Sequence, residues 1–149
     1  MAYQNLKQFI SYLENNDELI RVSELVNPSL EISEITDRIV KSTNNKALLF
    51  ENNGTSFPVF MNSMGSYRRI CMALGVSHLD AINEKMDFLF SKFSSVPLGL
   101  FNKMALLPQL GKVSSFFPVS VRSKARCQEV IHRDPDLNIL PALKTWPFD

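Results

Sequence analysis

Glycine is scarce in this sequence, and its scarcity limits the kinds of site that the chain can build. Only 5 of the 149 residues are glycine, whereas nucleotide-binding proteins cradle phosphate groups in glycine-rich loops. The chain also contains no P-loop, no dinucleotide-binding fingerprint and no nucleophile elbow. The sequence therefore argues against sites of these types.

Cysteine and histidine are equally few, with two of each. Cys71 falls in a helical pattern and Cys127 opens a strand-like run, and neither has CxxC spacing or a neighbouring histidine. We predict two buried or half-buried thiols in a reducing compartment. His78 precedes a predicted helix, where a capping side chain is the ordinary role.

His132 is followed by Asp134 and Asp136, which could offer oxygen ligands to a cation. The run lacks the Gly and the closing Glu of a calcium-binding loop. We therefore predict no metal site in this chain.

An excess of one charge is absent as well, since 16 basic and 15 acidic residues give a net charge of +1. Such a balance creates no long-range field that would attract nucleic acid. The one basic stretch, Arg122, Lys124 and Arg126, lacks interleaved aromatic residues and is predicted to be a solvated linker. Residues 1–5 do not form a signal peptide, so we expect a cytoplasmic protein without a transmembrane segment.

Helical periodicity is present in four segments. Residues 6–14 and 30–41 each show one apolar stripe opposite charged side chains. Residues 66–75 begin with a capping Ser66 and end at Gly75, a common helix stop. A longer helix is expected from Ser77 to Phe93, with an apolar seam facing a core. A short helix is expected between residues 94 and 115.

Strand-like runs cover residues 18–22, 46–51, 57–61 and 127–132. The second and third runs lie at hairpin distance and are expected to pair. Pro58 cannot donate a ladder hydrogen bond, so its strand should lie at an edge or begin there. Together the patterns predict an α+β fold, a small mixed β-sheet covered by several helices.

Two features could be mistaken for a site. Gly65 and Ser66 open a helix whose free amides could receive an anion, with Arg68 and Arg69 adjacent, but a turn and a helix cap are favoured. The carboxylates of residues 31 and 34 lie on a charged helix face, where solvation is the ordinary state and acid–base work would need burial. The residues alone predict no catalytic, cofactor-binding or metal-binding group.

Several short sequence segments, taken in their order along the chain, resemble the N-terminal domain of the UbiD family. These enzymes decarboxylate or carboxylate aromatic and α,β-unsaturated acids. The matching stretches are residues 5–10, 16–22, 30–38, 47–52, 57–66, 73–75 and 127–149, with Arg69 among them. Each phrase is weak alone, but their common order and spacing are hard to obtain by chance.

The resemblance implies a carboxy-lyase that uses prenylated FMN with a divalent metal (Mn) and K. It also implies a flavin prenyltransferase as cofactor supplier, a small carboxylic acid as substrate and a homo-oligomer. In one branch the substrate is 3-polyprenyl-4-hydroxybenzoate, in ubiquinone synthesis. The cofactor and the Glu-Arg-Glu catalytic set are expected on a split-barrel domain after Asp149, so this segment alone should be inactive.

By the same resemblance, residues 1–126 form the N-terminal domain of a multidomain enzyme and residues 127–149 begin the connection to the flavin-binding domain. Trp146 should then be exposed in this chain and packed in the full enzyme. Arg69 is expected to form an ion pair within or between domains. The alternative is a complete, non-enzymatic α+β interaction module of related ancestry, and the reading frame beyond Asp149 would distinguish the two.

Overall fold

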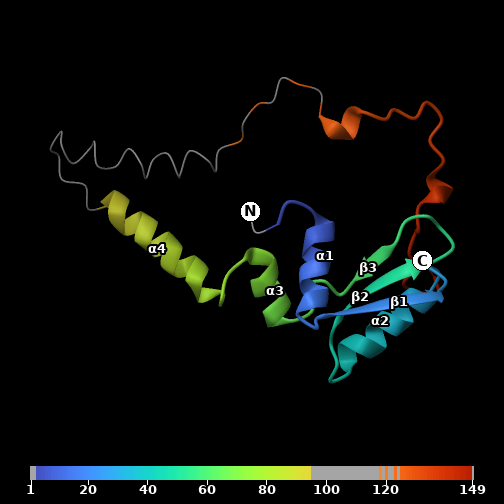
Figure 1. The fold of residues 1–149 in the computed structure, drawn as a ribbon, viewed down its shortest axis with the longest axis horizontal. Helices are drawn as coiled ribbons and strands as arrows, with labels where there is room; N and C mark the ends of the chain where they lie inside the picture. The colour runs from blue at the N-terminus through green and yellow to red at the C-terminus, as the bar shows by residue number, and fades with distance from the viewer. Residues whose placement is uncertain (1–2, 95–117, 119, 121–122, 124, 149) are drawn as a thin grey trace. The chain divides into compact units, whose positions relative to one another are not determined.

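The structure is a computed structural model that describes residues 3–94, 118, 120, 123 and 125–148. It divides into two compact units, one formed by Met1–Ala81 with Asp136–Asp149 and the other by Ile82–Pro135. Figure 1 shows the helices and strands of each. The predicted helix between residues 94 and 115 lies outside the described residues.

A three-stranded mixed sheet forms the centre of the first unit, with the strand order β1-β2-β3. The central strand β2 (Ala47–Asn52) runs parallel to β1 (Leu19–Leu25) and antiparallel to β3 (Val59–Met61). Helix α2 (Glu31–Lys41) makes the crossover between the parallel strands. The α+β fold, the pairing of β2 with β3 and the edge strand beginning after Pro58 are confirmed.

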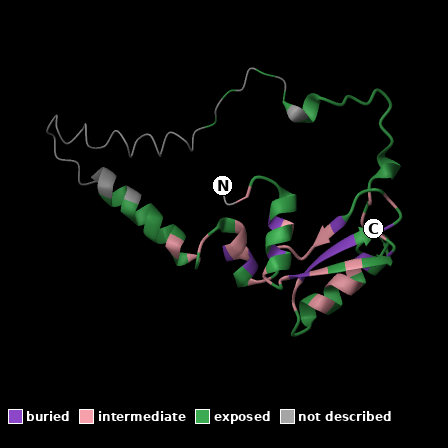
Figure 2. Cartoon of the chain, viewed as in Figure 1, coloured by how far each residue is buried: buried purple, intermediate pink, exposed green. Residues whose placement is uncertain are grey.

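Strand β2 is buried on both faces, because successive side chains of a strand point to opposite sides. Ala47 and Leu49 belong to one hydrophobic cluster, and Leu48 and Phe50 belong to the other. Helix α1 (Leu6–Asn15) packs on the first cluster, whereas α2 packs on the second. The helical members are Phe9 and Leu13 for the first cluster and Ile32 for the second. Figures 1 and 2 show this layering and the burial of the central strand.

Local capping marks the ends of two of the predicted helices. The Asn5 side chain accepts a hydrogen bond from the Gln8 amide at the start of α1. Ser66 caps α3 (Tyr67–Leu74), and Gly75 ends it in the left-handed conformation with φ 65°. This conformation is costly for residues with a Cβ atom. The helix from Ser66 to Gly75 is thus confirmed together with both of its end signals.

Strand β1 is longer than the predicted run of residues 18–22. It continues to Leu25, and its register with β2 shifts between Val22 and Leu25. Leu25 is 69% exposed, so its apolar side chain does not contribute to the core. The extension depends on pairing with Asn52 rather than on burial.

The second unit contains most of helix α4 (Asp80–Ser94) and the short 3-10 helix η1 (Arg126–Gln128). The existence of α4 is confirmed, but Ile82 and Met86 of its apolar seam are exposed, contrary to the prediction. The other described element of this unit is η1, which is too short to cover a helix face. No helix among the described residues is long and apolar enough to cross a membrane.

The predicted strand at residues 127–132 is wrong. Residues 129–132 are irregular, and Val130 and Ile131 are 71% and 81% exposed. A β-branched run forms a strand only when a partner satisfies its backbone groups, and the described part of the chain offers this run none. Cys127 is consequently exposed, whereas Cys71 is buried as predicted.

The last described stretch returns to the first unit. Lys144 forms a parallel β-bridge with Ser29, and two backbone hydrogen bonds join Lys144 to Pro28 and Leu30. Leu143 packs against the hydrophobic cluster under α2. The segment that ends in Trp146 is therefore attached to the loop that precedes α2. The predicted division at residues 126 and 127 stays a prediction.

Candidate functional site

The buried Arg69 guanidinium lies at the centre of a polar cluster where three loops meet. Arg69 occupies the first turn of α3 and is 0% exposed. Its Nη1 donates to Glu18 Oε2 at 2.9 Å and to the Asn45 carbonyl at 2.5 Å, and its Nη2 donates to Asn45 Oδ1 at 3.2 Å. Its Nε has no hydrogen-bond partner among the described residues. The predicted ion pair of Arg69 is confirmed and lies within the first unit.

Two asparagines close the cluster around this arginine. The Asn62 amide donates to Asn45 Oδ1 at 2.7 Å and to the Lys46 carbonyl at 2.8 Å, and the Asn45 amide donates to the Gly65 carbonyl at 2.9 Å. A Cβ atom at Gly65 would lie 1.7 Å from Asn62 Oδ1. Only glycine therefore fits at position 65 without displacing the asparagine.

The helix start beside Gly65 is occupied by its own cap. Ser66 Oγ accepts the Arg69 amide at 3.1 Å. The neighbouring Arg68 is 61% exposed, and its Nη1 lies 3.1 Å from Glu18 Oε1. Glu18 thus pairs with both arginines, one buried and one at the surface. The contacts match the favoured interpretation, a turn and a helix cap.

A second charged group lies on the surface at the junction of α1, β1 and β2. Arg21 donates to Glu14 and to Glu51, each at 2.5 Å. The hydrogen bonds from Arg21 hold the pKa of the Glu14 carboxyl below its ordinary value. The pKa of Asp17 is lowered in the same way by a hydrogen bond from Lys46. The exposed pairs of Arg21 stabilise little on their own.

The two histidines lie at a helix start and at the surface. His78 Nδ1 accepts the Ala81 amide at 3.2 Å, which confirms its predicted role at the start of α4. His132 is exposed, and Asp136 accepts the amide of Asn138 at the start of the 3-10 helix η2 (Leu137–Ile139). Among the described residues, no three His, Cys, Asp or Glu side chains could together hold a metal ion.

A groove of about 760 Å³ lies between α2 and the segment that ends in Trp146, and we call it the α2 groove. Trp146 is 71% exposed, which agrees with the prediction for this chain. The lining residues are Leu30, Glu31, Ser33, Glu34, Asp37, Lys41, Thr145, Trp146 and Pro147. The groove therefore combines an exposed indole with three carboxylates and one ammonium group.

The loop at the rim of the α2 groove is strained. Leu30 has φ 73° and ψ −39°, and the amide of Glu31 donates to the carbonyl of Ser29 at 3.0 Å. This is a γ-turn with positive φ, a rare conformation for a residue that carries a Cβ atom. The backbone amide of Leu30 donates to the backbone carbonyl of Lys144 at 2.9 Å. The strained turn and the attached segment therefore form the rim together.

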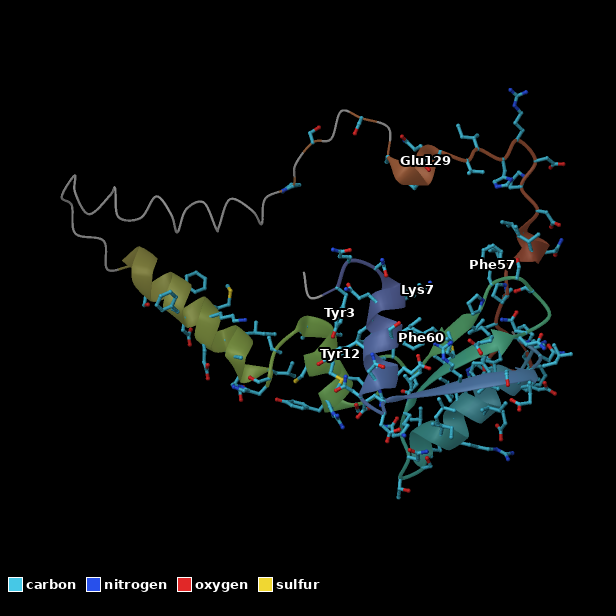
Figure 3. The ribbon with its side chains drawn as sticks, viewed as in Figure 1. Tyr3, Lys7, Tyr12, Phe57, Phe60 and Glu129 are labelled. Carbon is cyan, nitrogen blue, oxygen red and sulfur yellow. The ribbon has the colours of Figure 1, made fainter. Side chains whose placement is uncertain are left out.

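A second hollow, of about 520 Å³, is lined by three tyrosines, Tyr3, Tyr12 and Tyr67, together with Arg68 and Cys71. Figure 3 shows Tyr3 and Tyr12 beside α1, and their ring centroids are 5.5 Å apart. The Tyr3 hydroxyl donates to the carbonyl at residue 72, and burial raises the pKa of Tyr3. The rings thus pack the N-terminal residues onto α1 and α3.

A family profile covers most of these features. The profile described as the 3-octaprenyl-4-hydroxybenzoate carboxy-lyase N-terminal domain matches residues 10–89. The match includes the Arg69 cluster, the central sheet and α2. The chain belongs to the UbiD family. This finding confirms the resemblance at the level of the N-terminal domain.

Two relatives extend the similarity of this UbiD-family domain to its whole length. An uncharacterized protein of Aquifex aeolicus (strain VF5) is 41% identical over 149 residues, which is 99% of this chain. An uncharacterized protein of Archaeoglobus fulgidus is 41% identical over 150 residues, which is 100% of this chain. The chain spans about 30% of the length of each relative. Both relatives include the part that matches Trp146.

Sequence reasoning found Arg69 in the UbiD-family domain but missed most of its partners. Glu18 was visible only as the first residue of a strand-like run, and Asn45 and Asn62 lie in loops that carry no periodic pattern. The contacts join residues 24 to 51 positions apart in the chain. One local signal was available, which is the glycine at position 65 directly before the helix cap Ser66. Such a glycine often marks a close approach of another group.

Proposed function

We propose that this chain is the N-terminal part of a longer, cytoplasmic (de)carboxylase that acts on aromatic or α,β-unsaturated carboxylic acids with prenylated FMN. Membership of the UbiD family is the observation that carries this proposal. The chain covers about 30% of two relatives that are more than three times as long. One candidate substrate is 3-polyprenyl-4-hydroxybenzoate, which resembles the compound in the family's description.

The described residues do not fit the site of the implied cofactor. They provide no group of three metal ligands, and the helix start at Ser66 is occupied by its own cap. We propose that prenylated FMN, Mn and K bind to the remainder of the longer protein. A flavin prenyltransferase would supply the cofactor, and the full-length enzyme would be a homo-oligomer.

The chain itself would serve as a rigid support. The Arg69 cluster ties the loop before β1, the loop before β2 and the loop before α3 to one another. Support of this kind suits a domain that packs beside a catalytic domain and forms one wall of its cleft. The chemistry would be carried by residues of the catalytic part.

The test is to produce the full-length protein together with a flavin prenyltransferase and to incubate it with a panel of aromatic and α,β-unsaturated acids. We expect release of carbon dioxide from at least one acid, or incorporation of labelled bicarbonate in the reverse direction. The 149-residue chain, treated identically, should show neither. A full-length protein that carries the cofactor but is inactive on the whole panel would contradict the proposal.

A further inference from the structure

The α2 groove combines features of a site that recognises a cationic side chain. The indole of Trp146 offers an exposed aromatic face, and such faces attract cations held within about 6 Å. Three carboxylates and one ammonium group line the same groove, so its formal charge is negative. An aromatic face beside acidic groups suits a guanidinium, which stacks on rings and pairs with carboxylates.

The carboxylates of the groove are only partly engaged. Glu34 accepts from Arg38 at 2.7 Å, and Asp37 accepts from Lys41 at 2.7 Å. One oxygen of Glu31 accepts the amide of Asn27 at 2.7 Å. The side chains of the two ion pairs are between 51% and 76% exposed, and exposed pairs of this kind are weak. Each carboxylate has a second oxygen that can accept a hydrogen bond.

One wall of the groove also contains an unsatisfied polar atom. Ser33 lines the groove, and its Oγ is buried without a hydrogen-bond partner among the residues that the structure describes. A buried hydroxyl oxygen without a donor costs free energy. A donor brought to this hydroxyl would offset that cost.

The rim of the groove is also held in place by the chain. The strained Leu30 turn and the bridge between Ser29 and Lys144 fix the two sides of the entrance. Backbone strain of this kind is kept where the surrounding structure determines it, often at ligand clamps. The groove is thus preformed, because the segment that carries Trp146 is attached to the loop before α2.

We propose that the α2 groove receives an arginine side chain from the remainder of the longer protein, with its guanidinium stacked on Trp146 and paired with Glu34 and Asp37. This inference rests on the proposed function, because it requires a longer polypeptide around the chain. The relatives carry about 70% of their length outside the matched part, from which that arginine would come. The contact would fix the orientation of the N-terminal domain against the next domain.

The experiment is a titration of the 149-residue chain with N-acetylarginine amide, with N-acetylcitrulline amide as the neutral probe of matched shape. Trp146 is the only tryptophan of the chain, so its emission and its indole N–H resonance report on the groove. We expect a saturable change with the arginine probe and none with the citrulline probe. The double variant Glu34→Gln, Asp37→Asn should bind the arginine probe at least roughly five-fold more weakly than the unchanged chain.

A control variant removes the same amount of charge elsewhere. Glu24→Gln with Glu84→Gln changes two exposed carboxylates that do not line the groove, and it should bind the arginine probe as the unchanged chain does. Circular dichroism of each variant checks that the fold is kept.

Three outcomes would overturn the inference. They are an equal response to both probes, a response that the double variant leaves unchanged, and burial of Trp146 by a second copy at rising protein concentration without any probe. The titration and the carboxylic-acid assay can fail separately. Loss of the probe response leaves the assay of the longer protein unaffected, and an inactive full-length protein leaves the probe response measurable.

Discussion

Replacing Arg69 by alanine should destabilise the first unit more than any other single change of a charged residue in it. The variant removes three hydrogen bonds, one to Glu18 and two to Asn45. It leaves the Glu18 carboxylate, which is 13% exposed, without its buried partner. Removing one member of a buried ion pair typically costs about 3–5 kcal/mol. Because Arg68 still lies 3.1 Å from Glu18, we expect a loss near the lower end, about 3 kcal/mol.

Urea denaturation of the 149-residue chain, followed by far-UV circular dichroism, measures this loss. The slope of the transition should stay the same while its midpoint falls. Arg68→Ala is the matched control, because this neighbouring arginine is 61% exposed and should cost at most about 1 kcal/mol. Arg69→Lys keeps the charge but has fewer donors, so its cost should lie between the two.

The reasoning would be refuted if Arg69→Ala and Arg68→Ala lowered the free energy of unfolding by the same small amount. That result would mean that the buried guanidinium contributes no more than a surface one. An Arg69→Lys variant as stable as the unchanged chain would also count against the geometry, because an ammonium group cannot reproduce the contacts of both terminal nitrogens.

Three further outcomes are expected. Gly65→Ala should cost about 2 kcal/mol in the same denaturation assay, because its Cβ atom displaces the Asn62 side chain, whose amide donates to Asn45 Oδ1 and to the Lys46 carbonyl. A loss under about 0.5 kcal/mol would speak against the close approach. The hydrogen bond from Arg21 lowers the pKa of Glu14 in the folded chain. The stabilisation of the fold by this pair is therefore complete above the pKa of an unfolded glutamate, about 4.3, and is lost as the pH falls through the lowered pKa. A carboxyl titration by NMR should give a lower midpoint for Glu14 than in an Arg21→Gln variant, and equal midpoints would disprove the interaction. One thiol, that of the exposed Cys127, should react with a thiol reagent in the native chain while the other reacts only on unfolding; simultaneous reaction of both would contradict the burial.

Local patterns predicted the first unit well where a periodic stripe coincides with a capping signal. The helix from Ser66 to Gly75 has a side-chain cap at one end and a glycine stop at the other, and both depend only on nearby residues. The run at residues 46–51 indicated a strand, and the structure places β2 there at Ala47–Asn52. Pro58 located the start of an edge strand, because proline cannot donate in a ladder.

Features that depend on distant partners could not be predicted in the same way. The run at residues 127–132 has strand propensity, but strand formation needs a partner that its sequence does not specify. The seam of α4 is apolar, but periodicity does not say what covers it. The Arg69 cluster joins loops that are far apart in the chain, and asparagine in a loop usually indicates a turn rather than a buried contact. The family resemblance supplied part of the missing information, because it depends on the order of short segments over the whole length of the chain.

Hydrogen exchange offers the most direct test of the central claim, that this chain is a domain of a longer enzyme and is covered there by the catalytic part. The amides of α2 and of the segment from Leu143 to Trp146 should exchange more slowly in the full-length protein than in the 149-residue chain. Amides of β2 serve as the internal control, because that strand is already buried in the chain and its exchange should change less. Equal exchange of the α2 groove in both proteins would contradict the claim and would favour an independent module.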